Sequence, residues 1–489
     1  AGEERSVARF SFAVSAVPRQ ELVQLVYLPF TLPEEPGRLT ALTAGLLNLG
    51  MVLLLWPWMS FAPRRLRVAA CGLTAEQVSW WRWFYKRILT EWAVVNGRNL
   101  FDIDLEIDAQ GTAPAAAVPW APAAGTRAGS GRRVLCPLGG GKDSLVVFEL
   151  LRHQGASEVS WLYVGDGVGE FSGSPRLQGI VEASGSTCLV MEHDFGLDQV
   201  AEVRARRQLG RGFKVQGNPW AALVAFDSVI VATALGFDTV AVGNERSANF
   251  GNGVFLEGAG ERLEVNHQFD KSLEFERAMH LYARKYLDPA VYYFSPLQQL
   301  WESQIAQIFC SRLRSFQGLF ISCNRSQGSR EWCRSCDKCC FVYALLSGFL
   351  ELDGAARLAE AFGEDLLDRE ELLPTFRGLL GAPGASRLQK PLECVGEPEE
   401  AALSLALARC RRRRGAAAMP CCLAALGPEL HLAPGLARRL LAAGPVSPEG
   451  AECPEHLCPA WWTWPAAVLE DLAREAERSE ALLAGSALG

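Results

Sequence analysis

The sequence carries no large excess of charge of either sign. Its 489 residues include 48 lysines and arginines against 55 aspartates and glutamates, a net charge of −7. This balance argues against a general nucleic-acid-binding protein, which needs a basic surface. The chain also lacks the evenly spread cysteines of a small secreted domain, because five of its fifteen cysteines fall between Cys323 and Cys340. We therefore infer a reducing compartment.

Internal repeats and a secretory signal are also missing. Charged residues at positions 3–5 precede a mixed stretch, which does not predict a signal peptide. A charge-free run covers residues 39–61 and is long enough for a membrane span. Asn48 and Pro57 interrupt it, and its character changes at Met51–Trp56. We predict a buried helix followed by a buried strand at Met51–Trp56, and no membrane span.

Two common phosphate loops are excluded by spacing in the run from Cys136 to Ser144. A Walker A loop needs glycine where Cys136 stands, and a hydroxyl directly after Lys142, where Asp143 stands. A dinucleotide-binding fingerprint needs glycine where Ser144 stands. The glycines of this run must therefore serve another kind of loop.

The same run has the setting of an anion site. Val134-Leu135 ends an apolar strand, residues 139–141 are glycines, and residues 145–151 predict a helix. Glycines let a ligand approach the backbone, and the helix start offers free N–H groups. Gly-Gly-x-Asp-Ser after a strand resembles the pyrophosphate loop of the N-type ATP pyrophosphatases, which cleave ATP to AMP and pyrophosphate while adenylating an oxygen. The alternative is an ordinary glycine-rich turn with a capping aspartate.

Composition divides the chain into four parts. Residues 1–108 predict an N-terminal α/β domain with an aromatic-rich helix at 74–95, whose rings we interpret as core. Residues 109–133 are rich in alanine, proline and glycine and predict a linker. Residues 134–345 alternate strands and helices, which predicts an α/β domain with a parallel sheet and ligands at the carboxyl ends of its strands. Residues 346–489 predict a helical region.

Within the sheet domain we predict strands at 159–164, 187–191 and 239–242 and a helix at 219–235. Polar residues 243–247 leave the last of these strands, where the chain passes over a site. A second polar group, residues 265–272, contains His267, Asp270, Lys271 and Ser272. It suits substrate contacts or general base catalysis. The alternative is a polar loop in which Asp270 or Ser272 caps a helix.

A cysteine motif predicts a metal site. Cys323, Cys333, Cys336 and Cys339 have the spacing C-x9-C-x2-C-x2-C. Four thiolates at short intervals suit tetrahedral zinc, and four protein ligands leave no open position, so the zinc would be structural. Cys340 is a spare ligand. Unligated buried thiols or redox cysteines are the alternatives.

Taken together, these stretches resemble the MurL family, UDP-N-acetylmuramoyl-L-alanyl-L-glutamate epimerases related to the ATP pyrophosphatases. The resemblance is carried, in order, by residues 139–144, 243–248, 265–268, 271–276, 322–325, 332–339 and 393–396. It implies a PP-loop fold and ATP-dependent epimerisation of the terminal glutamate of the UDP-linked muramoyl dipeptide in peptidoglycan synthesis. The expected location is the cytoplasm, or a plastid or other organelle if the host is a eukaryote.

The resemblance also implies roles for individual residues. ATP phosphates would be held by Gly139, Gly140, Gly141, Lys142 and Ser144, and Mg²⁺ by Asp143. The nucleotide, the substrate carboxylates or the charge that develops during adenylation would be met by Asn244, Glu245, Arg246 and Lys271. For proton transfer we consider His267 first and Cys394 second. One departure is Gln298, where the family pattern leads us to expect an arginine.

Two other functions stay open from the sequence. One is another adenylating enzyme, such as a 7-cyano-7-deazaguanine synthase-like amidating enzyme, whose cysteine pattern is similar. The extra N-terminal domain and the Leu-Gly-Gly-Gly start of the loop argue against it. The other is a non-catalytic nucleotide-binding protein, against which the intact Lys142-Asp143-Ser144 run argues.

Overall fold

The structure is a computed structural model of the chain. It describes residues 5–14, 21–70, 72–103, 105–109, 132–154, 156, 158–206, 213–217, 219–325, 331–381, 388–415, 418–433, 435–441 and 457–486. The predicted linker therefore lies outside the described residues, apart from positions 109, 132 and 133.

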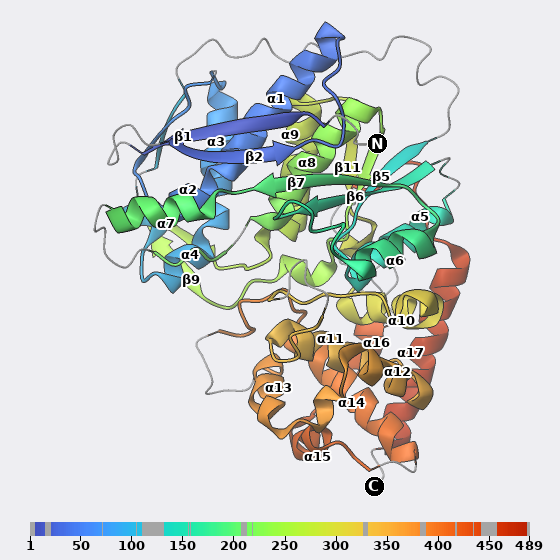
Figure 1. Cartoon of the computed structure of the whole chain (residues 1–489). Coiled ribbons are helices and arrows are strands. Elements are labelled where there is room, and N and C mark those ends of the chain that lie inside the picture. The colour runs from blue at the N-terminus through green and yellow to red at the C-terminus, as the bar shows by residue number, and fades with distance from the viewer. Residues whose placement is uncertain are drawn as a thin grey trace.

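A seven-stranded sheet forms the centre of the molecule (Figure 1). Its order is β1 (Val7–Ala13), β2 (Glu21–Tyr27), β7 (Cys188–Asp194), β6 (Glu158–Gly165), β5 (Arg133–Pro137), β8 (Thr239–Ala241) and β11 (Tyr292–Phe294). Strands β7 to β11 run parallel, and β1 and β2 extend the sheet antiparallel. The protein is thus mixed α/β with a mostly parallel sheet.

Alternate residues of β5 face opposite layers of helices. Val134 and Cys136 belong to one core and Leu135 to the other, as the alternation of side chains along a strand requires. The first core contains α5 (Lys142–Arg152), α6 (Pro175–Ser184) and α10 (Glu302–Arg312). The second contains α1 (Pro36–Leu53), α2 (Leu55–Phe61), α3 (Ala75–Ile88), α4 (Thr90–Val95), α8 (Trp220–Leu235) and α9 (Leu273–Tyr286).

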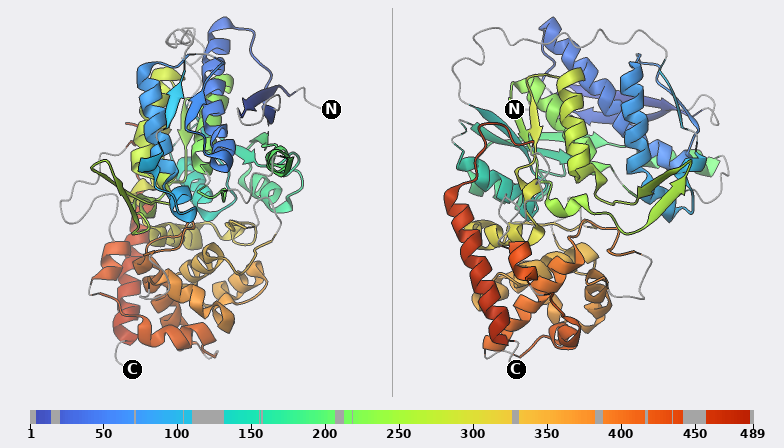
Figure 2. Two further views of the ribbon diagram at one scale, coloured as in Figure 1. Left: turned by 90° about the vertical axis from the view of Figure 1, so that its left-hand side faces the viewer. Right: turned by 180° about the vertical axis from the view of Figure 1, so that it is seen from behind.

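The remaining elements flank this centre. A short helix, α7 (Leu197–Arg206), follows β7, and two small sheets pair β3 (Arg65–Arg67) with β4 (Glu106–Asp108) and β9 (Phe255–Gly258) with β10 (Glu261–Glu264). The C-terminal part is helical and is gathered on one side of the sheet (Figure 2). Its helices are α11 (Asp337–Ser347), α12 (Leu352–Phe362), α13 (Leu373–Leu379), α14 (Pro398–Arg414), α15 (Cys421–Leu426), α16 (Leu436–Leu441) and α17 (Ala466–Ser486).

Most predicted elements of the sheet region are confirmed. The strands predicted at 159–164, 187–191 and 239–242 are β6, β7 and β8, and the helix predicted at 219–235 is α8. The helix predicted at 74–95 is also found, divided at Leu89 into α3 and α4.

The strand predicted at Met51–Trp56 is wrong, because this segment continues the helical run from α1 into α2. Met51, Val52, Leu53 and Leu55 are all buried, so no exposed face gives the segment a period. An apolar run without a period cannot be assigned to strand or helix from sequence.

Helices α1 and α2 together are long and apolar enough to cross a membrane by length and composition, with a mean hydropathy of 1.9. In the fold, 61% of that window is buried. A Cβ on Gly45 would lie 2.8 Å from Cγ1 of Ile230, so α1 packs closely against α8. Asn48 also accepts a hydrogen bond from the hydroxyl of Tyr282 (2.5 Å). These contacts are those of a core helix.

The N-terminal segment shares the central sheet and the second core. Strand β2 pairs with β7, and the aromatic rings of α3 pack on α8 and α9, for example Trp81 on Phe226 at 5.5 Å between ring centroids. The expected core role of these rings is therefore confirmed. The domain boundaries at 108, 133 and 345 stay a prediction.

Candidate active site

The glycine loop joins the end of β5 to the start of α5, as the sequence predicts. Gly140 has φ of +75°, a conformation that glycine adopts without strain. Its carbonyl accepts a hydrogen bond from Ile321 N–H (2.8 Å), and a Cβ on Gly141 would lie 2.9 Å from Ser322 Oγ. The loop therefore rests on the segment that leads to Cys323. Free N–H groups at the start of α5 offer a place for an anion.

Lys142, which follows the loop, is fully buried between two carboxylates. Its Nζ lies 2.5 Å from Asp143 Oδ1 and also pairs with Glu302 Oε2, at the start of α10. Lys338 Nζ lies 3.9 Å from the other oxygen of Glu302. Burial lowers the pKa of Lys142, but the two carboxylates outweigh it and raise that pKa. Burial raises the pKa of Asp143, but Lys142 and Lys338 outweigh it and lower that pKa.

The polar segment after β8 lies directly against this loop. A Cβ on Gly243 would lie 3.2 Å from the carbonyl carbon of Asp143, so the two segments touch through their backbones. Asn244 N–H donates to Ser295 Oγ (3.0 Å), and Glu245 is buried. The Arg246 guanidinium stacks on Trp301 at 4.7 Å from the ring centroid.

His267 and Cys394, 127 positions apart in the sequence, are hydrogen-bonded neighbours in the fold. Gln268 Nε2 donates to Val395 O (3.0 Å), and Asn252 Nδ2 donates to Pro391 O (2.9 Å), which holds the Cys394 segment in place. Asn252 Oδ1 accepts from His267 N–H (2.9 Å), so one side chain positions both partners.

The pair is charged at neutral pH. Burial raises the pKa of Cys394, but Lys271 and His267 outweigh it and lower that pKa to about 7. Burial lowers the pKa of His267, but Cys394 and Glu91 outweigh it and raise that pKa to about 10. Between these values the thiol is a thiolate and the imidazole is protonated, which is the reactive form of a cysteine.

Lys271 links the two halves of the site. It is buried, and its ammonium interacts with Cys394, Glu245 and Asp143, which together raise its pKa although burial lowers it. Gln298 stands where an arginine was expected. Its Nε2 donates to Lys271 O (2.8 Å), and its Oε1 accepts from Asn249 Nδ2 (2.9 Å), so here Gln298 supports the Lys271 turn.

Asp270 and Ser272 show that the polar loop also has a structural role. Ser272 Oγ accepts from Phe275 N–H and caps α9, as one reading of the sequence expected. Asp270 Oδ2 instead accepts from Ala222 N–H (3.0 Å), at the start of α8. The loop therefore both caps a helix and presents His267 and Lys271.

Three charged residues of the site were not singled out from the sequence: Glu91, Glu302 and Lys338. Glu91 lies in the aromatic-rich region, and Glu302 is one of many acidic residues in a first helical turn, so neither stands in a motif. Lys338 lies inside the cysteine motif, between Cys336 and Cys339, and its place there was the one available signal.

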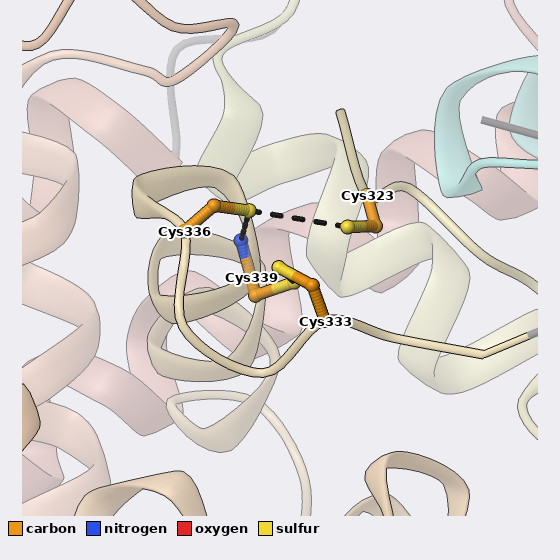
Figure 3. A group of neighbouring side chains, drawn as sticks. All are labelled: Cys323, Cys333, Cys336 and Cys339. Atoms are coloured by element: carbon orange, nitrogen blue, oxygen red, sulfur yellow. Dashed lines mark hydrogen bonds between the residues drawn. The ribbon is translucent and has the colours of Figure 1, made fainter. Parts of the chain in front are cut away.

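The four predicted metal-binding cysteines converge on one point (Figure 3). All four sulfur atoms lie within 4.8 Å of one another. Cys323 Sγ is 4.0 Å from Cys336 Sγ, and Cys333 Sγ is 3.7 Å from Cys339 Sγ. Tetrahedral zinc with Zn–S bonds of about 2.3 Å requires sulfur separations of roughly 3.8 Å, so the residues fit zinc. Cys340 lies outside this group.

A cavity of about 340 Å³ lies elsewhere, between α10, α12 and α17. Charged residues line it, among them Arg314, Arg357, Asp471 and Glu475. It contains none of the predicted site residues, so it is not the place where the glycine loop and the thiol meet.

Comparison with known proteins agrees with this arrangement. The family model described as the MurL N-terminal domain matches residues 1–296, and the MurL C-terminal domain matches residues 319–430. The glycine loop and His267 lie in the first match, and the cysteine cluster and Cys394 in the second. Glu302 and Gln298 lie between the two matches.

Three similar proteins bear the name UDP-N-acetyl-alpha-D-muramoyl-L-alanyl-L-glutamate epimerase. The protein of Xanthomonas oryzae pv. oryzae is 31% identical over 83% of this chain and 83% of its own. That of a Micromonospora species is 31% identical over 82% and 83%, and that of Salinispora tropica is 32% identical over 57% and 56%. With both family domains matched in order and these relatives aligned over most of its length, the chain belongs to the MurL family.

Proposed function

We propose that this chain epimerises the terminal L-glutamate of UDP-N-acetylmuramoyl-L-alanyl-L-glutamate to D-glutamate, through an acyl-adenylate, with release of AMP and diphosphate. The supporting observation is that Lys271 touches both the glycine-loop carboxylate Asp143 and the thiol of Cys394. An adenylating loop and a proton-transfer pair therefore border one site. The free thiols of the described cysteines and the need for ATP favour a reducing, ATP-rich compartment such as the cytoplasm.

Adenylation would be the work of a PP-loop. The α-carboxylate of the glutamate attacks the α-phosphorus of ATP and displaces diphosphate. Backbone N–H groups of residues 139–141 and the side chains of Lys142 and Ser144 would hold the departing phosphates. Lys142 would exchange Glu302 for a phosphate as its partner. The half-buried carboxylate of Asp143 fits a hard cation, so Asp143 would hold magnesium, which neutralises phosphate charge when bound.

Proton removal becomes feasible once the carboxylate charge has been neutralised by adenylation. The Cys394 thiolate removes the α-proton, and Lys271, with Asn244, Glu245 and Arg246 nearby, stabilises or orients the charge that develops. His267 and Cys394 touch each other, so they act together on one face of the substrate. The planar intermediate then takes a proton from the solvent on its other face. Water hydrolyses the acyl-adenylate to D-glutamate and AMP.

The direct test is incubation of the full chain with the UDP-linked dipeptide, ATP and Mg²⁺, followed by chiral analysis of the glutamate and assay of AMP and diphosphate. We expect D-glutamate, with AMP and diphosphate in equal amounts. Diphosphate without D-glutamate would assign the loop to a different acceptor, as in the amidating enzymes. No ATP consumption would identify a nucleotide-binding protein without this activity.

The rate of epimerisation is expected to depend on pH through the thiol–imidazole pair. The lowered pKa of Cys394, about 7, means that the thiolate and the rate both rise as pH passes 7. The raised pKa of His267, about 10, means that the imidazolium is lost, and the rate falls, near pH 10. The check is a profile of kcat/KM against pH. A rise centred at about 8.5 or above, the value of an unperturbed thiol, would contradict the assignment of Cys394.

We also propose that the four cysteines hold structural zinc. Cys336→Ser is expected to remove the metal and to lower the thermal unfolding temperature by more than roughly 5 °C. The measurements are elemental analysis of the purified chain and thermal unfolding. Cys340→Ser is the matched control, because Cys340 is equally buried but outside the cluster, and it should keep the metal. A wild-type chain purified with no zinc, and unchanged by added zinc, would refute the proposal.

A further inference from the structure

Glu91 is a buried carboxylate that the proposed reaction does not yet use. It lies on α4, in the N-terminal part of the chain, and is 1% exposed. Its Oε2 lies 2.7 Å from His267 Nδ1. Its Oε1 has no hydrogen-bond partner among the described residues. A carboxylate in such a place is costly unless a cation compensates it.

The position of Glu91 is fixed by tight packing. A Cβ on Gly217 would lie 3.2 Å from the Cβ of Glu91. The next residue, Trp92, is fully buried, and its Nε1 donates to Met59 O (3.0 Å). The carboxylate is thus held toward His267 by the second core and not by a mobile loop.

His267 consequently meets two partners on its two sides. Nδ1 faces Glu91, which leaves Nε2 as the nitrogen available to Cys394. The other charged groups that act on the pair are Asp270, beside His267, and Lys271 and Lys338, beside Cys394. Of these, Glu91 is the one that hydrogen-bonds the far side of the ring.

We propose that Glu91, His267 and Cys394 form a carboxylate–imidazole–thiol relay in which Glu91 is a positioning residue. It accepts the Nδ1 proton of His267, fixes the ring with Nε2 toward the sulfur, and stabilises the imidazolium that keeps the thiol ionised. Proton transfer moves one proton from the thiol to Nε2 and leaves the carboxylate ionised throughout. The catalytic part of this inference rests on the proposed function, whereas the state of the thiol does not.

The test measures the thiol directly in the full chain, without substrate. Native protein is treated briefly with iodoacetamide at a series of pH values, and alkylation of the peptide that contains Cys394 is followed by mass spectrometry. Wild type is expected to show a midpoint near 7, as the pKa of Cys394 implies. Glu91→Gln, which keeps the shape and removes the charge, should raise that midpoint by at least about one unit toward that of a free thiol, about 8.5. Glu91→Asp, which keeps the charge, should restore most of the shift.

The matched control is Asp227→Asn. Asp227 is a fully buried carboxylate paired with a histidine, His193 Nε2 at 2.8 Å, and it lies outside the site. Its variant should leave the alkylation midpoint of Cys394 unchanged. Near-UV circular dichroism of each variant checks that the fold is kept, and Glu91→Asp serves if Glu91→Gln does not fold.

The outcomes separate the relay from the proposed function. A raised midpoint in Glu91→Gln, together with epimerisation reduced by about 10²-fold or more, supports both. A raised midpoint in a chain that does not epimerise at all supports the relay and rejects the function. An unchanged midpoint in Glu91→Gln, or an equal shift in Asp227→Asn, overturns the relay, whatever the effect on epimerisation.

Discussion

Replacing Asp143 by asparagine is expected to lower ATP cleavage by about 10³-fold, because removing charge stabilisation at a transferring phosphoryl group costs several kcal/mol. The carboxylate stands at the first turn of α5, next to the glycine loop, and pairs with Lys142 at 2.5 Å. Lys142 keeps Glu302 as a partner in the variant, so the fold should survive. The measurement is substrate-dependent release of diphosphate.

Asp194→Asn is the matched control for this prediction. Asp194 is likewise an acidic residue at the carboxyl end of a parallel strand, β7, where its Oδ1 accepts from Gly196 N–H (3.0 Å). The control should cleave ATP at the wild-type rate. Diphosphate release by Asp143→Asn within about threefold of wild type would remove the PP-loop role from this segment.

Replacing Cys394 by alanine is expected to separate the two half-reactions. Loss of a general base lowers epimerisation by roughly 10²–10⁴-fold, while the glycine loop still adenylates the substrate. The variant should therefore release AMP and diphosphate with little D-glutamate formed. The measurement is the ratio of D-glutamate to diphosphate, which should fall far below the wild-type value.

Cys188→Ala controls for the loss of a half-buried thiol. Cys188 lies on β7, and burial raises its pKa to about 12, so it is not a reactive thiolate. Its variant should keep the wild-type ratio of D-glutamate to diphosphate. If Cys394→Ala keeps that ratio too, the base is another group and the thiol–imidazole pair is not used in the reaction.

The parts of the site that are local in sequence could be predicted from it. The glycine loop and the cysteine motif each occupy a short stretch, and their spacing alone restricts the chemistry. The pairing of His267 with Cys394 could only be proposed through the family resemblance. Their contact depends on Asn252 and Gln268, which bring a segment more than a hundred positions away against the 265–272 loop.

The parts that depend on burial could not be predicted. Glu91 and Glu302 are ordinary acidic residues in the sequence, and only the fold shows that both are buried against a cation. The same limit explains the error at Met51–Trp56. There, burial on all sides removes the periodicity by which a helix is distinguished from a strand.

The central claim is that adenylation of the glutamate enables removal of its α-proton. The most direct measurement is the reaction in D2O with the UDP-linked dipeptide, with and without ATP, followed by mass spectrometry and chiral separation of the glutamate. The account predicts one deuterium at the α-carbon of the D-glutamate, and none in glutamate of either configuration when ATP is omitted. Exchange at the α-carbon without ATP, or D-glutamate that carries no deuterium, would contradict it.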